Sequence, residues 1–400
     1  MFACPERLPA FHKATLALHT ESAKSSTPSS VASEGSLFLL SCTCLQLSAA
    51  APARAGISRE AEALVNWKAS LVSADESLGS WSLANSTSLC SWAYITCDPA
   101  KHITGLDLTI VTLNGTLDEF DFSAFSRLKK LTLFQNGGLY GTIPPGIGNL
   151  TSLIVLQIKG NPYLRGGIPR SIGQLKHLVV LEMSGLGLDG RLPEEIGNLT
   201  SLEELQLNFV TLTGSIPPTI GMLQKLRMLS FGKNNLSGSI PLEIGNMTEL
   251  LVLYLYDNYL KGQIPNTISH LTNLQDLDLS ENQLGGQIVL ELGNSSLLTV
   301  IIAKNNFSGL FPSSICGGAL RIVSAGYNGF TGIHHQTFQN CTTLQSVDFA
   351  ANNIVGDLKD YFGQHLEQLR TMAFSQNQLH GTILADEGEF YETSLEPSTR

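Results

Sequence analysis

The sequence has no run of about 18 apolar residues beyond residue 53, the length that a membrane-spanning helix needs. Basic residues are few, with 24 Lys and Arg against 34 Asp and Glu, and the net charge of −10 disfavours a polyanionic partner such as nucleic acid. A Walker loop, a G-x-S-x-G elbow, an H-E-x-x-H helix and the protein kinase signatures are also missing. We therefore expect no catalytic site, no cofactor and no metal.

Two short segments imitate functional motifs. Gly185 to Gly190 match G-x-G-x-x-G, but the match lies inside a repeat and opens no helix after a nucleotide-binding strand. His334 and His335 have no further ligands nearby, so a solvated loop is the favoured interpretation. Neither segment changes the expectation of a non-enzymatic protein.

The chain instead repeats one pattern, L-x-x-L-x-L-x-x-N-x-L-x-G-x-I-P, about every 24 residues between Ile103 and Leu384, a period typical of leucine-rich repeats. Two units show it plainly, one beginning at Leu226 and the next at Leu250. Repeats begin at Ile103, Leu128, Leu153, Leu178, Leu202, Leu226, Leu250, Leu274, Leu297, Leu320, Leu344 and Leu369. The pattern predicts about twelve repeats over residues 103–384, the last of them partial.

The L-x-L triplet alternates apolar and polar residues, as a half-buried strand does. A strand this short cannot bury its apolar side alone, so the repeats must stack into a parallel, curved sheet. The fold class predicted is an α/β solenoid with a parallel sheet on its concave face. The Asn of each unit is expected to satisfy backbone groups at a buried turn. Its position holds Val111, Leu186 and Val210 in three units, and beyond residue 286 the Ile-Pro pair is mostly lost. We interpret these breaks as ordinary drift among repeats, with a changed outer face beyond residue 286 as the alternative.

The segments outside the repeats have compositions of their own. Residues 37–53 combine a short apolar run with small residues, as a signal peptide does, and predict a secreted chain that begins near residues 52–57. Residues 1–36 form an atypical extension without domain character, expected to be disordered, and we interpret it as the product of an upstream start codon or of a wrongly assigned start. Residues 385–400 are an acidic tail. Either this tail covers the last rung of the solenoid, or the chain is the front part of a longer protein.

Residues 57–100 are expected to form an N-terminal cap. Ser58 to Val72 has an apolar stripe at helical spacing, and Cys90 and Cys97 follow it around a short loop. Cys316 and Cys341 lie 25 residues apart, at almost the same place in successive repeats, so stacking should bring them together. Neither pair has metal-ligand spacing, and two disulfides, Cys90–Cys97 and Cys316–Cys341, are predicted.

Nine N-x-S/T sequons are plausible glycosylation sites in a secreted chain, although the repeat itself favours Asn in this context. They are Asn85, Asn114, Asn149, Asn198, Asn235, Asn246, Asn294, Asn306 and Asn340. None falls on the expected strand face, so that face is left free for a partner.

On that concave face, the residues that flank the L-x-L leucines should point to solvent. Exposed aromatic and acidic side chains gather there between residues 209 and 281. We predict that the ligand-binding residues are Phe209, Ser230, Tyr254, Tyr256, Asp257, Asp276, Asp278 and Glu281. Aromatic residues often dominate interfaces, and carboxylates pair with basic groups of a ligand. Eight strands span roughly 38 Å, enough for about a dozen residues of an extended peptide.

These residues together resemble the extracellular domain of plant leucine-rich repeat receptor kinases. The resemblance covers residues 57–384 and is carried by the cap with Trp67, Trp81 and Cys90-x-Trp92-x(4)-Cys97, by the L-x-G-x-I-P repeat, and by the segment around Cys316 and Cys341. It implies a twisted superhelix with a second small sheet, an extracellular or cell-surface location, a short secreted peptide or a protein as ligand, and a shorter leucine-rich repeat co-receptor kinase as partner. It places the chain in immunity or development.

The chain also departs from that family. The membrane span, the kinase domain and the C-terminal cysteine cap are missing, and Tyr94 replaces the usual cap glycine. The paired arginines that hold a peptide carboxylate in some receptors are absent at Ser324 and Gly326. Two alternatives remain: a secreted inhibitor of a cell-wall enzyme, similar to polygalacturonase-inhibiting proteins, and a truncated, non-signalling adaptor.

Overall fold

The computed structural model describes residues 58–288, 296–316, 319–335, 337–339, 341–362 and 368–380. The predicted N-terminal extension, the signal-like segment and the acidic tail lie outside the described residues.

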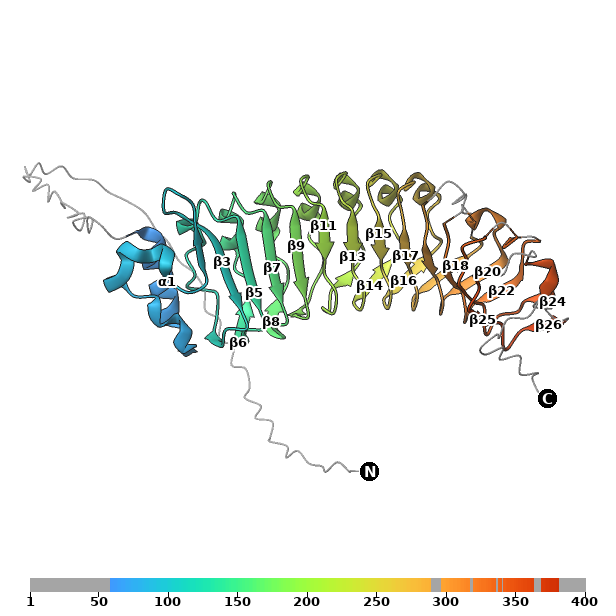
Figure 1. The fold of residues 1–400 in the computed structure, drawn as a ribbon, viewed down its shortest axis with the longest axis horizontal. Coiled ribbons are helices and arrows are strands. Elements are labelled where there is room, and N and C mark those ends of the chain that lie inside the picture. The colour runs from blue at the N-terminus through green and yellow to red at the C-terminus, as the bar shows by residue number, and fades with distance from the viewer. Residues whose placement is uncertain are drawn as a thin grey trace, which may run out of the picture. The chain divides into compact units, whose positions relative to one another are not determined.

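One long sheet runs through the whole repeat array (Figure 1). It has 13 strands, and neighbouring strands are parallel except that β2 pairs with β3 in the antiparallel sense. Its strands are β2 (Ile95–Cys97), β3 (Ile103–Thr109), β5 (Lys130–Phe134), β7 (Val155–Lys159), β9 (Val180–Ser184), β11 (Glu204–Gln206), β13 (Met228–Ser230), β15 (Val252–Tyr254), β17 (Asp276–Asp278), β19 (Thr299–Ile301), β21 (Ile322–Ser324), β23 (Ser346–Asp348) and β25 (Thr371–Ala373). The parallel solenoid predicted from the repeat period is confirmed.

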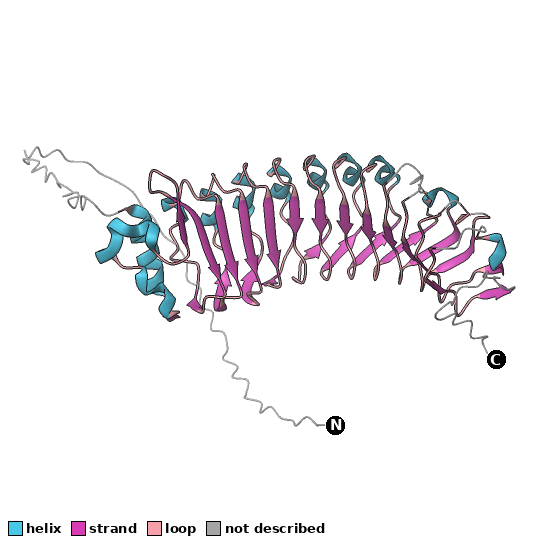
Figure 2. Ribbon diagram, in the orientation of Figure 1, coloured by secondary structure: helices cyan, strands magenta, loops and turns pink. Residues whose placement is uncertain are grey.

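Shorter strands follow the turn of each repeat and form a second layer of small sheets (Figure 2). One sheet has the order β1-β4-β6-β8-β10, the next β12-β14-β16-β18-β20-β22, and β24 pairs with β26. Their bounds are β1 (Ser73–Ala74), β4 (Leu113–Gly115), β6 (Gly137–Thr142), β8 (Tyr163–Gly166), β10 (Gly187–Leu188), β12 (Thr213–Gly214), β14 (Asn235–Gly238), β16 (Tyr259–Gly262), β18 (Gln283–Gly286), β20 (Asn306–Phe311), β22 (Gly329–Ile333), β24 (Val355–Asp357) and β26 (Gln378–His380).

The outer side of most described repeats is a 3-10 segment that follows a proline, whereas the first and the last of these segments follow Asp121 and Asp357. Proline there cannot donate a backbone hydrogen bond and fixes its own φ, so it suits the start of a short helix. These segments are η3 (Phe122–Ala124), η4 (Pro145–Asn149), η5 (Arg170–Gln174), η6 (Glu194–Asn198), η7 (Pro218–Met222), η8 (Leu242–Asn246), η9 (Asn266–His270), η11 (Ser313–Ile315) and η12 (Leu358–Asp360). Past Gly286 the described segments shorten from five residues to three, which favours the alternative of a changed outer face over simple drift of the repeat.

The core lies between the long sheet and the outer segments. Leu205, Leu229, Leu253 and Leu277 are direct neighbours along the long sheet, and each is fully buried. Beyond Gly286 phenylalanines take over much of this role, and the rings of Phe311 and Phe349 meet edge to face with centroids 4.9 Å apart. Stacking therefore buries what a single repeat cannot bury alone.

The predicted role of the repeat asparagine is confirmed. The Asn258 amide nitrogen donates to three backbone carbonyls, among them Phe231 O at 2.9 Å, and its Oδ1 accepts the Leu236 N–H at 2.9 Å. The same arrangement recurs from Asn234 to Asn377. Where Leu186 and Val210 replace the asparagine, the second layer is interrupted between β10 and β12, and an isolated bridge pairs Arg191, beyond the end of β10, with Thr213 of β12.

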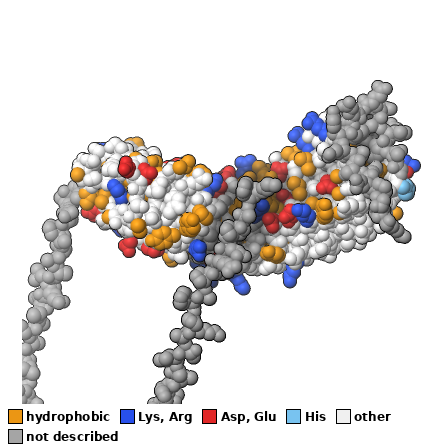
Figure 3. All heavy atoms as spheres, turned by 90° about the horizontal axis from the view of Figure 1, so that it is seen from below, with side chains coloured by type: hydrophobic (Ala, Val, Ile, Leu, Met, Phe, Trp, Pro, Cys, Tyr) orange, Lys and Arg blue, Asp and Glu red, His pale blue; other side chains and the backbone are white. Residues whose placement is uncertain are grey.

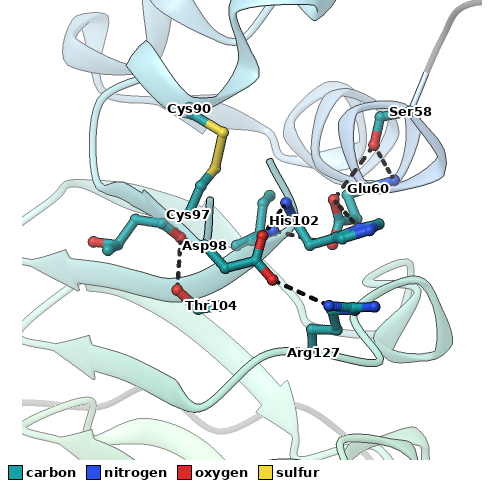
Figure 4. A network of polar contacts seen from close by, with 10 residues as sticks. Ser58, Glu60, Cys90, Cys97, Asp98, His102, Thr104 and Arg127 are labelled. Carbon is teal, nitrogen blue, oxygen red and sulfur yellow. Dashed lines mark hydrogen bonds and ion pairs between the residues drawn. A yellow bond between two sulfur atoms is a disulfide. The ribbon is translucent and has the colours of Figure 1, made fainter. Parts of the chain in front are cut away.

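The N-terminal cap is helix α1 (Arg59–Ser70) followed by η1 (Glu76–Ser80) and η2 (Leu83–Ser91). The Ser58 hydroxyl accepts the Glu60 N–H and caps the helix, and the buried Glu60 carboxylate accepts the Ile103 N–H of the first long strand at 3.1 Å (Figure 4). Burial raises the pKa of Glu60 above its ordinary 4.5. Val72, predicted to belong to the apolar stripe, is instead 73% exposed because the helix ends before it.

Both predicted disulfides are confirmed. Cys90–Cys97 ties η2 to β2, and Cys316–Cys341 joins successive repeats with its Cα atoms 5.4 Å apart. Within the described residues no helix is long and apolar enough to cross a membrane.

Candidate functional site

The solvent-facing side of the 13-stranded sheet, here called the long-sheet face, presents side chains in columns. Because the strands are in register, outward residues of successive repeats stand next to each other. One such column is Gln206, Ser230, Tyr254, Asp278, Ile301, Ser324 and Asp348. The predicted site residues Ser230, Tyr254, Asp276 and Asp278 are thus brought together on three neighbouring strands.

Tyr254 and Tyr256 form an aromatic pair near the middle of this face. Their ring centroids are 6.4 Å apart in an edge-to-face arrangement. The Tyr256 ring lies across the backbone of Gly232, where an added Cβ would come within 2.3 Å of the ring. Only glycine therefore leaves space for this ring orientation.

A hydrogen-bond network supports that arrangement from the preceding repeat. The Asn208 side-chain oxygen accepts from the Ser230 hydroxyl and from the Gly232 N–H, both at 2.8 Å. Ser230 is 4% exposed, so it supports the face rather than offering contact area. The predicted ligand-binding residues include neither Asn208 nor Gly232, although a glycine two residues after the strand was a signal that a neighbouring group approaches the backbone closely.

Three carboxylates beside the tyrosines form no ion pair among the described residues, although the charge of Asp257 acts on Lys304 and helps to raise the pKa of that ammonium group. Asp257 and Asp276 make no side-chain hydrogen bond there, while Asp278 accepts only from the hydroxyl and the N–H of Ser280. By contrast, Lys304 neutralises Glu281 at 2.6 Å. We call Tyr254, Tyr256, Asp257, Asp276 and Asp278 the tyrosine–aspartate patch.

The electrostatics of the patch reflect burial among like charges. Burial raises the pKa of Asp278 above its ordinary 3.8, and Glu281 adds to the effect. Burial also raises the pKa of Tyr254, with Asp276 and Asp278 contributing further. A cation placed here would relieve these repulsions, so the patch is suited to a Lys or Arg side chain that reaches the face from solvent.

Three predicted site residues lie in the turn after the strand rather than on the strand face. Phe209, Asp257 and Glu281 have left-handed backbones, with φ between 54° and 55°. They belong to one row of non-glycine residues with positive φ, here called the left-handed row: Phe209, Lys233, Asp257, Glu281, Lys304, Tyr327, Ala351 and Gln376. Phe209 is 56% exposed and carries the Lys233 ammonium 5.2 Å above its ring. The row borders the long-sheet face along one edge.

The seven sequons within the described residues lie away from the long-sheet face. Asn85, Asn149, Asn198 and Asn246 lie in 3-10 segments, and Asn114, Asn235 and Asn306 lie on strands of the second layer. Six of these seven side chains are exposed and Asn114 is half-buried. Asn294 and Asn340 lie outside the described residues.

No group of three or more His, Cys, Asp or Glu side chains within the described part of the chain is arranged to hold a metal ion. The His334 ring contacts only the neighbouring His335 carbonyl.

Comparison with known families places these features in a class. The model of the leucine-rich repeat N-terminal domain matches residues 57–98, a leucine-rich repeat region model matches residues 106–214, and single leucine-rich repeats match residues 225–247, 249–271 and 273–295. The chain is therefore a leucine-rich repeat protein with the N-terminal domain of that class. It is homologous to the leucine-rich repeat receptor-like kinases of Arabidopsis thaliana.

One such relative is the Arabidopsis LRR receptor-like serine/threonine-protein kinase RGI3, 34% identical over 100 residues. That match covers 25% of this chain and 9% of the kinase, so the chain corresponds to a small part of the relative's length.

Solved structures extend the likeness over most of the chain. The PEPR1–AtPEP1 structure matches 81% of this chain and 49% of that one, with 29% identity and a TM-score of 0.70. The ectodomain of the Arabidopsis receptor kinase HAESA with an extended IDA peptide hormone matches 81% and 66%, with 26% identity and a TM-score of 0.57. A plant ice-binding protein matches 81% and 95%, with 26% identity and a TM-score of 0.62. The structural neighbours are thus mainly plant receptor ectodomains.

Proposed function

We propose that this chain is an extracellular ligand-recognition module that binds an extended secreted peptide along its long-sheet face. The observation that carries the proposal is the tyrosine–aspartate patch: an aromatic pair and three carboxylates that form no ion pair, on a face free of sequons among the described residues. The fold alone does not define the ligand, since a plant ice-binding protein shares it. The site therefore has to carry the argument.

The patch favours a particular kind of peptide. A Lys or Arg side chain can lie against the Tyr254 and Tyr256 rings while its charge meets Asp276 or Asp278. The Asn208 network and Gly232 hold the Tyr256 ring before the ligand arrives, so little rotamer freedom is lost on binding. A peptide of about a dozen extended residues would cover eight strands, with its basic residue near the centre.

Signalling through a second protein is part of the proposal. HAESA was also solved with the peptide hormone IDA and the co-receptor SERK1. By likeness, a shorter leucine-rich repeat co-receptor kinase is the partner proposed here, at the plasma membrane or in the extracellular space. The inhibitor and adaptor alternatives would use the same long-sheet face, so variants of the patch also test a protein partner.

The test is a selection of random dodecapeptides displayed on phage against the secreted, glycosylated chain. We expect selected peptides to be enriched in Lys or Arg. The double variant Tyr254→Ala/Tyr256→Ala should weaken binding of a synthetic selected peptide by roughly 100-fold, since loss of two central aromatic contacts typically costs about 1–2 kcal/mol each. Asp278→Asn should weaken it by about tenfold.

Two matched controls belong to this experiment. Tyr259→Ala removes an exposed tyrosine of the same repeat from the second layer, and Asp348→Asn removes a carboxylate that makes a similar turn hydrogen bond three strands away. Both should leave affinity nearly unchanged. Selected peptides without basic residues, or equal binding to all variants, would show that the patch is not the site.

A further inference from the structure

A second concave feature lies away from the long-sheet face, on the small sheet formed by β4, β6 and β8. It is an open pocket of about 470 Å³, lined by Asn114, Gly138, Tyr140, Gly141, Tyr163 and Arg165. We call it the second-sheet pocket. Its volume is in the range of small-ligand sites. Figure 3 views the molecule from the side on which β6 and β8 lie, and hydrophobic side chains gather there.

The strand register explains the pocket. Tyr140 on β6 is the direct partner of Tyr163 on β8, and Asn114 on β4 is the partner of Gly138. Gly138 and Tyr140 are two residues apart and share one side of the sheet. Because Gly138 has no side chain, the sheet leaves open space between Asn114 and the two tyrosines. A Cβ added to Gly138 would lie 3.2 Å from the Asn114 Cβ and would occupy part of that space. The pocket is therefore built by the sheet itself.

The polar groups around the pocket are available to a ligand. Tyr140 and Tyr163 are 43% and 55% exposed. Within the described residues no hydrogen bond or ion pair involves either tyrosine hydroxyl, the Arg165 guanidinium or the Asn114 side-chain amide. Two aromatic faces, a planar cation and a glycine floor suit a pyranose ring, which offers C–H groups on its faces and hydroxyl or amide groups at its edge.

Asn114 itself identifies the occupant. It begins the sequon Asn114-Gly-Thr116, so a glycan attached to its Nδ2 starts at the edge of the pocket. A covalently attached sugar reaches the tyrosines at a far higher effective concentration than any free saccharide. We propose that the first sugars of an N-linked glycan on Asn114 bind in the second-sheet pocket, against Tyr140 and Tyr163.

This glycan would have a structural role in the small sheet. Asn114 is also one of the two residues of β4 that pair with β1 of the cap, and its carbonyl accepts the Val72 N–H at 2.8 Å. A glycan seated on β6 and β8 thus connects the edge of the cap with the first repeats. The proposal goes beyond ligand recognition on the long-sheet face and requires only that the chain enters the secretory pathway.

The test compares two sequons of one protein. The full chain, secreted from plant cells, is treated under native conditions with a peptide N-glycosidase, and release at each site is followed by mass spectrometry of glycopeptides. Asn306 is the internal control, because it lies on second-layer strand β20 and has Gly285 as its partner in the neighbouring strand. We expect the Asn114 glycan to be released roughly tenfold more slowly than the Asn306 glycan, because its sugars must first leave the rings of Tyr140 and Tyr163 before the glycosidase can reach them.

Variants decide whether the pocket causes the protection. Tyr140→Ala/Tyr163→Ala should make both release rates equal, and Arg165→Ala is a milder second variant in case the double variant folds poorly. Tyr259→Ala, an exposed tyrosine elsewhere in the second layer, should change nothing. An unmodified Asn114, or equal release rates in the wild type, overturns the proposal.

A further arm separates an attached from a free sugar. The Asn114→Gln variant is titrated with N,N′-diacetylchitobiose, and the tyrosine signals are followed by NMR. We expect binding only at high millimolar concentration. Tight binding of the free disaccharide, together with a freely released Asn114 glycan, would assign the pocket to an external saccharide and overturn the proposal as stated.

Discussion

Replacing Asn258 by leucine should destabilise the repeat array by about 2–4 kcal/mol, mainly because one buried backbone N–H group loses its hydrogen-bond acceptor. The buried Leu236 N–H has the Asn258 Oδ1 as its partner, and a buried N–H without a partner costs about 1–3 kcal/mol. The amide donors matter less individually. After the change, the Phe231 carbonyl still accepts a hydrogen bond from the Asn234 amide, and the Leu255 carbonyl still accepts one from the Asn282 amide. We assign about 1 kcal/mol to these weakened bonds.

The substitution Asn258→Asp tests the acceptor role and the donor role of that side-chain amide separately. The new carboxylate keeps an acceptor for the Leu236 N–H but places an oxygen where an amide nitrogen now donates to Phe231 O at 2.9 Å. Two acceptors then face each other in a buried place, so Asn258→Asp should be more destabilising than Asn258→Leu at neutral pH. Its effect should lessen in acid, where the protonated carboxyl can donate.

The assay is urea denaturation of the secreted chain followed by far-UV circular dichroism. Asn266→Ala is the control, because Asn266 is an exposed asparagine on η9 of the same repeat. The reasoning is refuted if Asn258→Leu lowers the free energy of unfolding by less than about 1 kcal/mol, since one buried unsatisfied N–H alone should cost that much.

Three further predictions concern the cap, a disulfide and a surface ion pair. The pKa of Glu60 is raised in the folded chain, so the contribution of this residue to stability is fully present below pH 4.5 and is lost as the pH rises through the native pKa. The variant Glu60→Gln cannot ionise there and should become more stable relative to wild type across that pH range. Urea titrations at several pH values measure this difference. Cys316→Ser/Cys341→Ser should lower the free energy of unfolding by about 3.5 kcal/mol, the loop-entropy value for 25 residues, and a loss below 1 kcal/mol in calorimetry would contradict it. Glu281→Gln should leave the urea midpoint unchanged, because its bond to Lys304 is largely exposed.

Much of the fold follows from the repeat period. The spacing of Leu226, Leu250 and their equivalents predicts stacked parallel strands, and the asparagine at its place predicts the ladder that Asn258 forms. Both predictions hold because a repeat of this length can bury its leucines and pair its backbone groups in only one stacked arrangement. The cysteine pairs are predictable for the same reason, since one repeat of separation places Cys316 beside Cys341.

The finer geometry of the face was not predictable from alternation. Period-two alternation places Phe209 and Asp257 on the strand face, but the chain turns left-handed there. The only sign of this turn in the sequence is the glycine at the equivalent position of two earlier repeats, Gly160 and Gly185. The ring of Tyr256 over Gly232 depends on contacts between repeats that spacing alone does not specify. The second-sheet pocket was missed because its residues belong to the variable positions after the strand.

The left-handed row has a consequence for how such proteins diversify. Its backbone is the same in the eight repeats that contribute to it, with φ near 55°, while its side chains run through Phe, Lys, Asp, Glu, Tyr, Ala and Gln. Each non-glycine residue there bears a conformational cost of about 1–2 kcal/mol whatever its side chain is. Exchanging one of them for another is therefore nearly neutral for folding, so mutation can rewrite this edge of the binding face without first acquiring a compensating change in the core.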